Sequence, residues 1–424
     1  MRSYKRTFYL VDKFIERSTC LKSFILTSLN LVLSNIYLIL LGLQFDESFV
    51  GELSFYYRSA YMLSIVSLLG TDSYILTVLG ESKKMANYHY RLLLSILLIS
   101  LLISALFAYF FNLFYHEGFH FILYTVALTS LILVSYGAQS KILSSSSILY
   151  RNISFPLIVI LCLVCSLCFN IQLTPEKILI YSSITFLILT TFTLYLLYHL
   201  IDKGVDTHSF SINSLSMAYK SGFLFMPFSL SFTIINVSDV IILGILSDYH
   251  QTGVYSIAIA LASFGSVGLL TINCFMPLLI RRLYSINKLN VLNILIKNMN
   301  VISSALLIPA FLIGALVILA KFYNSTNLYE YIFTYIIYFA GVSANVVFGP
   351  CGYVLNMTGK AKKSSSIILQ AALINVVIGI LLAKPLGSIG VAIGAAWATV
   401  YMNYKMHSYA KTNIGIIPGI ILKN

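Results

Sequence analysis

Apolar runs of about twenty residues recur along the whole of this 424-residue chain, and each could cross a bilayer as a helix. Hydrophobic residues make up 59% of the chain and charged residues 10%, with a mean hydropathy of +0.90. So few polar side chains cannot cover a soluble protein of this length. The pattern predicts an all-α integral membrane protein with twelve transmembrane helices, near residues 23–43, 53–79, 92–115, 120–140, 154–173, 178–201, 221–246, 254–280, 301–320, 331–356, 366–383 and 388–404.

Basic residues are divided unevenly between the predicted loops. With both termini placed inside, the inner segments hold 23 of the 27 Lys and Arg residues, the outer loops hold three, and Arg58 lies within a span. Because Lys and Arg accumulate in cytoplasmic loops, this division predicts a multi-pass protein with both termini in the cytoplasm. The basic residues form short clusters between apolar spans and no single basic face, which argues against a nucleic-acid partner.

The chain carries an internal repeat at an offset of 202 residues, without gaps. The matched pairs include Gly42 with Gly244, Asp46 with Asp248, Gly51 with Gly253, Ser54 with Ser256 and Ala60 with Ala262. Chance similarity between apolar helices is the alternative, but Leu and Ile match by chance more readily than Gly and Asp do. In a membrane protein such a repeat indicates two packed bundles with a transport pathway between them. The four glycines are therefore candidate structural positions.

The longest inner connection, Ile201–Lys220, is polar, contains Gly204 and has no strong apolar period. These properties are typical of a linker. We therefore predict a six-helix lobe at 1–203, a cytoplasmic linker at 204–217 and a second six-helix lobe at 218–424. Both lobes would insert in the same direction, so the repeat is parallel, and the lobes would face each other across a central cavity.

Three ionisable side chains lie plainly within predicted spans, namely Arg58, Asp72 and Asp239. Each costs several kcal/mol there unless it faces a cavity or a partner. On an unbroken helix, Arg58 and Asp72 lie within about 40° of each other and ~21 Å apart along the axis. Ser54 and Tyr61 share that face, which we interpret as the wall of a wet cavity. The alternative is that both charges lie in the interfacial zones and reach water from there.

A second polar lane follows the seventh predicted span. Ser229, Thr233 and Asn236 recur at helical spacing, and Asp239 follows one turn later. Pro227 removes a backbone hydrogen bond near the inner end of the same helix, which predicts a kink. A hinge that serves alternating access and a static kink both fit this proline.

Motifs for enzymatic chemistry and for cofactors are missing from the sequence. It contains no phosphate-binding glycine loop with its lysine and no HExxH pair of metal ligands. Cys162, Cys165 and Cys168 share a helical face, but no His or carboxylate on that span completes a metal site. We therefore predict no catalytic residues, no metal and no cofactor.

Three segments of the second half carry a family resemblance. The first segment runs from Pro227 to Ala258 and contains Asp239–Gly244 and Gly253–Ala258. The second is Leu355–Lys360, and the third is Pro385–Ala396. They are similar to the Wzx-type flippases of O-antigen and other polysaccharides, in the multidrug/oligosaccharidyl-lipid/polysaccharide (MOP) exporter superfamily. The resemblance implies two six-helix lobes around a cavity that opens alternately to each side. It also implies an oligosaccharide repeat unit on undecaprenyl diphosphate, flipped across the bacterial inner membrane during lipopolysaccharide biosynthesis, with polysaccharide polymerase machinery as a partner.

The resemblance and the polar lanes together suggest roles for individual residues. Asp239 matches the acidic position of the family's seventh span, and we interpret Asp72 and Asp239 as coupling or cavity residues. Arg58 would hold the diphosphate and Tyr61 would stack on a sugar face, with Asn236 as a further substrate-binding residue.

The first half departs from this pattern, since Tyr37 stands at the repeat position of Asp239 and Leu53 at that of Tyr255. This departure leaves a symmetric role for the two halves open. Two other functions also stay open. A cation-coupled multidrug antiporter of the same superfamily would need acidic groups in its cavity. Membrane enzymes of the O-antigen polymerase type have a large outer loop, and this sequence has none.

The charge distribution generates a test of topology. Reporter fusions after Lys203 and after Asp248 should report the cytoplasm and the outside respectively, because one predicted span separates these positions. The measurement is the activity of a compartment-specific reporter at each fusion point. Fusions that report the same compartment would rule out the twelve-span arrangement.

Overall fold

The computed structural model describes residues 17–80, 87–115, 118–140, 144–201, 212–273, 276–323 and 327–420. These residues form helices and no strand, so the predicted all-α class is confirmed. The helices are α2 (Arg17–Gln44), α3 (Glu47–Leu68), α4 (Thr71–Gly80), α5 (Asn87–Tyr115), α6 (Phe119–Gln139), α7 (Ser144–Phe169), α8 (Pro175–His199), α9 (Ile212–Leu246), α10 (Tyr249–Ser263), the 3-10 turn η1 (Phe264–Ser266), α11 (Val267–Asn273), α12 (Met276–Ser285), α13 (Leu289–Ala305), α14 (Leu307–Phe322), α15 (Leu328–Phe348), α16 (Cys351–Met357) and α17 (Ala361–Asn413).

Within the described ranges, nine helical stretches are long and apolar enough to cross a membrane, and Leu29–Gln44 in α2 is a shorter apolar helix. The last two predicted spans both lie in α17, where Gly387 interrupts the helix with a φ of 54°. The count of twelve spans stays a prediction. Of the predicted linker, residues 204–211 lie outside the described residues, and α9 already begins at Ile212.

The second predicted span, 53–79, is not one helix. It divides into α3 and α4, because Leu69 and Gly70 both adopt positive φ, at 48° and 77°. A side chain on Gly70 would collide with the backbone carbonyl of Gly222, so the break brings this turn against α9. Glycine suits such a turn because it has no Cβ and tolerates a positive φ. The prediction of an unbroken helix is therefore wrong at this point.

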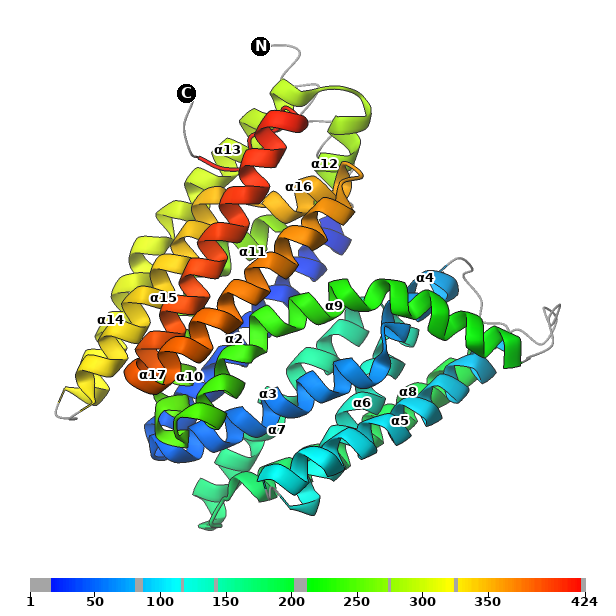
Figure 1. Ribbon diagram of the computed structural model, residues 1–424, viewed down its shortest axis with the longest axis vertical. Coiled ribbons are helices and arrows are strands. Elements are labelled where there is room, and N and C mark those ends of the chain that lie inside the picture. Colours follow the sequence, from blue (N-terminus) through cyan, green and yellow to red (C-terminus); the bar gives the residue numbers. More distant parts are fainter. Residues whose placement is uncertain are drawn as a thin grey trace.

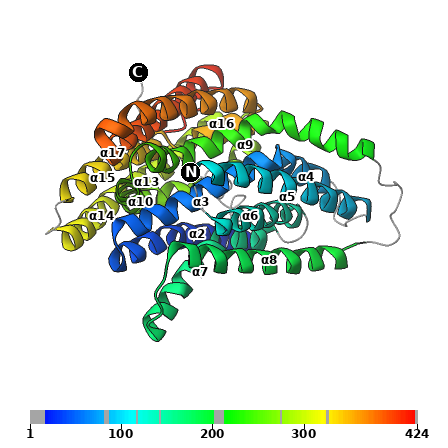
Figure 2. The same ribbon diagram turned by 60° about the horizontal axis from the view of Figure 1, so that its bottom comes forward.

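Apart from α2 and α9, which each also pack against the other half, the helices form two groups that correspond to the two halves of the sequence (Figure 1). The groups meet where α3 packs on α10, and they diverge toward α4 in one group and α12 and α16 in the other. The long helix α9 is bowed and packs against α17 in its own half and against α3 and α4 in the first half. Figure 2 shows α17 and α8 on opposite faces of the molecule, with α2 and α3 between them.

The repeat glycines lie where the two halves touch. A Cβ on Gly51 would collide with the carbonyl oxygen of Tyr249, and a Cβ on Gly253 would collide with that of Glu47. The repeat offset relates Glu47 to Tyr249 as it relates Gly51 to Gly253. Each glycine therefore faces the symmetry-equivalent carbonyl across the α3–α10 contact. Small residues allow helices in a membrane to approach this closely.

The other glycine pair follows the same symmetry. A Cβ on Gly42 would lie 2.6 Å from Cδ1 of Ile257, and a Cβ on Gly244 would collide with the Phe55 ring. Residues 55 and 257 are again one repeat offset apart. Both pairs of contacts thus repeat in three dimensions, and chance similarity between apolar helices does not explain that.

The paired aspartates of the repeat occupy equivalent helix termini. Asp46 is the N-cap of α3 and Asp248 is the N-cap of α10. The Asp248 side chain accepts a hydrogen bond from the backbone N–H of Gln251 at 2.6 Å, whereas the Asp46 side chain makes no such bond. An aspartate at this position satisfies a backbone N–H that the first turn of a helix leaves unpaired.

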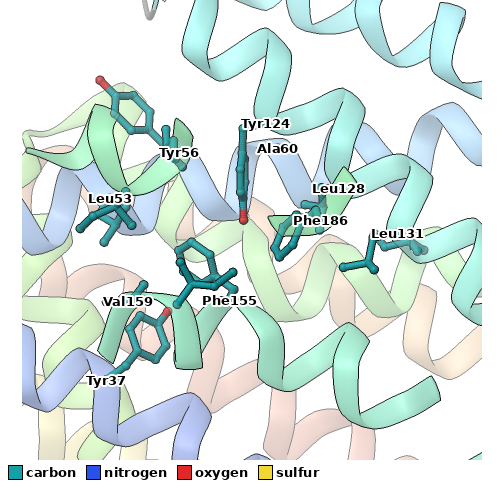
Figure 3. Close-up of a cluster of buried hydrophobic side chains, with 14 of the residues drawn as sticks. Tyr37, Leu53, Tyr56, Ala60, Tyr124, Leu128, Leu131, Phe155, Val159 and Phe186 are labelled. Carbon is teal, nitrogen blue, oxygen red and sulfur yellow. The ribbon is translucent and has the colours of Figure 1, made fainter. Parts of the chain in front are cut away.

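The first half has an apolar core where the second half has polar groups. Tyr37 and Leu53 are buried in the cluster that Figure 3 shows, beside Phe155 and Val159 of α7. The rings of Tyr37 and Phe155 meet edge-on, with centroids 5.7 Å apart. The repeat positions of Asp239 and Tyr255 are therefore occupied by packing residues in the first half.

The glycine contact predicts a steep steric effect. Gly253→Ala should destabilise the folded protein by about 1–3 kcal/mol or more, because its new Cβ overlaps the α3 backbone, which cannot move without separating the halves. Gly352→Ala is the matched control, since its Cβ would meet only Sδ of Met406, at 3.9 Å. The measurement is the thermal midpoint of purified protein in detergent. Equal midpoints for Gly253→Ala and the wild type would contradict the contact.

Candidate functional site

A cavity of about 670 Å³ lies among the helices of the second half. Its walls come from α9, the segment from α10 to α11, α15, α16 and both parts of α17. Segments more than 150 residues apart in the chain, such as Phe232 and Met406, meet there. The cavity lies within the size range of small-molecule sites, about 300–1,000 Å³.

The cavity wall is rich in neutral hydrogen-bonding groups. Its amide and hydroxyl side chains are Asn236, Asn273, Asn345, Asn356, Asn403, Ser263, Ser266, Ser364 and Thr399. Among the described residues that line it, Asp239 is the only charged one. Aromatic side chains contribute through Tyr338, Phe232 and Tyr353. Such a wall can donate and accept hydrogen bonds, and it places one acid and no cation in contact with an occupant.

Asp239 is held from two sides at the edge of this cavity. The Tyr255 hydroxyl donates to Oδ2 at 2.6 Å, and Nδ2 of Asn375 donates to Oδ1 at 2.6 Å. Asp239 is 6% exposed, and Tyr255 and Asn375 are fully buried. Charge-assisted hydrogen bonds of this kind stabilise an acid that would be costly in the membrane interior. The three residues bring together α9, α10 and α17.

Arg58 reaches the cavity edge from the first half. Its Nη1 donates to the backbone carbonyl of Asn236 at 3.0 Å, which links α3 to α9 three residues before Asp239. The charges of Arg58 and Asp239 are close enough to interact. The guanidinium is half-buried and lies 5.9 Å from the centroid of the Tyr57 ring. Arg58 is thus a cation of one half placed against α9 of the other.

The polar lane of α9 contributes less to the cavity than its spacing suggests. Ser229 and Thr233 donate to carbonyls of their own helix, at 3.2 and 2.9 Å. The Asn236 amide also donates within the helix, to Phe232 at 2.6 Å, but its side chain lines the cavity. Of the lane's side chains, only that of Asp239 hydrogen-bonds to other helices in the described part of the chain. The helix continues through Pro227 without a break, and Figure 1 shows it bowed along its length.

Arg58 and Asp72 lie on different helices because the chain breaks at residues 69 and 70, so a shared lane does not follow from the geometry of one helix. Asp72 lies in the first turn of α4 and is 2% exposed. The nearby cation is Arg151, whose guanidinium lies 4.4 Å from the centroid of the Tyr136 ring and whose charge acts on Asp72. Tyr61 is close to the same pair. The first half therefore holds its own charged cluster, apart from the second-half cavity.

Arg151, counted among the inner basic residues of the predicted topology, lies on a helix, because α7 begins at Ser144 and carries Arg151 in its second turn. Its Nη1 atom is buried and has no hydrogen-bond partner among the described residues. Arg58 is therefore not the only arginine on a helix that faces the interior. The one available signal was its position just before the apolar run that starts at Ile153.

A metal site is not evident in the described ranges, where no group of three His, Cys, Asp or Glu side chains is arranged to hold an ion. The closest approach to a ligand set is the carboxylate of Asp239 with the amide of Asn375. Both oxygens of that carboxylate already accept hydrogen bonds.

Comparison with solved structures gives the same fold in several membrane transporters. The lipid II flippase MurJ in an inward closed conformation matches with a TM-score of 0.65 and 15% identity, over 92% of this chain and 87% of MurJ. An inward-facing MATE-family multidrug transporter of the MOP superfamily matches with a TM-score of 0.61 and 12% identity, over 93% and 94%. The eukaryotic MATE transporter AtDTX14 matches with a TM-score of 0.52 and 14% identity, over 93% and 94%.

The chain has the fold of these transporters. Neither a family model nor a curated protein matches the sequence. The predicted all-α fold class is thus confirmed by structure, while membership of the MOP superfamily and the Wzx type stay proposals.

The Asp239 site predicts an energetic coupling. Asp239→Ala and Asn375→Ala should each lower the free energy of unfolding, and the double variant should lose about 0.5–3 kcal/mol less than the sum of the two. The reason is that either single change leaves a buried polar group without its partner. The measurement is a double-mutant cycle by denaturation in mixed micelles. Asn413→Ala, at the exposed end of α17, is the control partner. Strict additivity between residues 239 and 375 would contradict the coupling.

Proposed function

We propose that this protein is a flippase that moves an oligosaccharide on undecaprenyl diphosphate from the inner to the outer leaflet of the bacterial inner membrane. The observation that carries the proposal is the combination of a cavity walled by amides and hydroxyls with the Arg58 guanidinium at its edge. A polar glycan and a diphosphate cannot cross hydrocarbon unless other groups replace their water. The cavity offers hydrogen bonds to the glycan. The planar guanidinium of Arg58 can donate two parallel hydrogen bonds to the phosphate oxygens.

The fold supports transport as the broader function. Solved structures with this fold are described as a lipid II flippase and as multidrug transporters. In the proposed cycle the two helix groups open alternately to each side of the membrane, while the polyprenyl chain stays in lipid between them. Asp239 and Asp72 are the acids available to couple this movement to a cation, one in each half.

A cation-coupled drug antiporter of the same superfamily is the second candidate. Its organic cations would need free acidic groups in the cavity. Here the single acid of the wall, Asp239, already accepts hydrogen bonds from Tyr255 and Asn375 at both oxygens. Arg58 beside it further lowers the attraction for a cation. The chemistry of the cavity therefore favours the lipid-linked sugar over the drug.

An enzymatic function, such as that of an O-antigen polymerase, gains no support. Solved structures with this fold are transporters. The proposed partners are the lipid-linked oligosaccharide, membrane lipids and the polymerase machinery that would receive the flipped units.

Arg58 tests the proposal most directly. In a strain that lacks the gene, surface polysaccharide should be restored by the wild type, partly by Arg58→Lys, and little by Arg58→Ala. A hydrogen bond to a charged group contributes about 1.5–3 kcal/mol, so the alanine variant should transport roughly ten- to a hundredfold more slowly. Lysine keeps the charge but loses the fork that matches phosphate. The measurements are surface polysaccharide and lipid-linked units in the inner leaflet, at equal protein levels.

Arg91→Ala is the matched control, because Arg91 is exposed at the start of α5 and its loss removes the same charge. It should restore polysaccharide fully. Full restoration by Arg58→Ala would defeat the proposed phosphate contact. A deletion strain without accumulated lipid-linked units would defeat the flippase proposal itself.

A further inference from the structure

The two halves of the molecule differ in the kind of charge that they place in their interiors. The first half contributes the arginines Arg58 and Arg151 together with one buried acid, Asp72. Among the described residues no Lys or Arg lines the second-half cavity, and Asp239 is the one charged residue of its wall. If one ligand occupies both regions, its anionic part would lie near the arginines of the first half and its neutral part would lie in the second-half cavity.

Unused hydrogen-bonding capacity remains in the cavity wall. Oδ1 of Asn273, Oδ1 of Asn356 and Oγ of Ser364 are buried and have no partner among the described residues. All three residues line the cavity. Buried polar groups are normally paired, and an unpaired group costs free energy that a ligand can recover. The wall therefore has buried hydrogen-bonding groups that the protein leaves unpaired, and a polar ligand could pair with them.

The chemistry of that occupant follows from the groups that would touch it. Amide and hydroxyl side chains both donate and accept hydrogen bonds, as sugar hydroxyls do. They can therefore serve as donor or as acceptor to each hydroxyl of a glycan. The Tyr338 and Phe232 rings line the same cavity and offer flat apolar faces for the C–H faces of a sugar. A phosphate would need a cation or a cluster of N–H donors, and the lining residues include no cation.

We infer that the second-half cavity is the binding site for the glycan of the lipid-linked substrate, and that it selects uncharged sugars over acidic ones. The inference rests on the proposed function and names the part of the substrate that this cavity holds. An acidic sugar would bring its carboxylate toward Asp239, and Arg58, which would be occupied by the diphosphate, would not offset the repulsion. Like charges in a partly desolvated site repel strongly because the surrounding dielectric is low.

The arrangement also assigns the two ends of the substrate. Arg58 stands at the cavity edge, bound to the backbone carbonyl of Asn236, so the diphosphate would lie between the halves while the sugars extend into the second half. Specificity for the glycan would then depend on α11, α15, α16 and α17 and not on the charged residues of the first half. The cavity volume of about 670 Å³ suits a short oligosaccharide and not a finished polymer.

The test uses the full-length protein in detergent micelles with three probes: maltotriose as a neutral trisaccharide, trigalacturonate as an acidic one, and undecaprenyl diphosphate. Ligand-observed NMR reports the sugars, and a competition assay reports the lipid. The wild type should bind the neutral trisaccharide at millimolar concentration and the acidic one at least about tenfold more weakly.

Two variants of similar volume remove amides from the wall, Asn345→Leu and Asn273→Leu. Each should weaken binding of the neutral trisaccharide about five- to tenfold, by the loss of hydrogen bonds to the sugar, and leave undecaprenyl diphosphate binding unchanged. Asn413→Leu, at the exposed end of α17, is the control and should bind like the wild type. Thermal midpoints of all variants show whether folding is intact, and the second wall variant keeps the test decisive if the first one unfolds.

The outcomes separate this inference from the proposed function. Lipid binding without trisaccharide binding, or trisaccharide binding that Asn345→Leu and Asn273→Leu leave intact, would overturn the glycan site and keep the flippase proposal. Equal or tighter binding of trigalacturonate would overturn the selectivity. Trisaccharide binding without undecaprenyl diphosphate binding would support the glycan site and defeat the lipid-linked substrate.

Discussion

The contact of α3 with α10 through Gly51 and Gly253 determines how the two halves sit together. Lipid tails are as apolar as Leu side chains, so helices in a membrane associate through close packing and not through the hydrophobic effect. Here the two backbones approach so closely that either glycine could not carry a Cβ. This fixed crossing holds one end of the two groups together, while the other ends diverge (Figure 1). Where the groups diverge they stay linked by α9, whose Gly222 packs against Gly70 in the turn before α4, so the halves are joined at one crossing and through this one long helix.

The repeat preserves packing but not chemistry. The glycine pairs and the N-cap aspartates make equivalent contacts or occupy equivalent termini in both halves. The acid and tyrosine of α9 and α10 instead correspond to Tyr37 and Leu53, which are buried against α7 (Figure 3). The constraint on the crossing point applies to both halves, because each glycine faces the other half. The hydrogen bonds of Asp239 go to Tyr255 and Asn375 of its own half, so this chemistry could diverge between the halves without disturbing the joint.

The sequence predicted the helices well because lipid leaves the backbone no alternative to internal hydrogen bonds. The break at Leu69 and Gly70 escaped prediction, since the apolar run continues through it and its cause is the approach of Gly222 from a distant helix. The lane of Arg58 and Asp72 was predicted from helical geometry extended across the same break, so that geometry does not support it. The amide-lined cavity could not be foreseen either. Its asparagines are scattered over helices that meet only in three dimensions.

Arg58 connects the joint to the cavity. Its guanidinium belongs to α3, whose backbone touches α10, and it donates to a carbonyl of α9 beside Asp239. That carbonyl is neutral, so a phosphate oxygen would be the stronger acceptor for the same N–H groups. On the proposed function, substrate that enters between the halves would compete with Asn236 for Arg58 and remove a contact that holds α3 to α9. Substrate binding and the separation of the halves would then be coupled through a single side chain, without any need for a symmetric site in the first half.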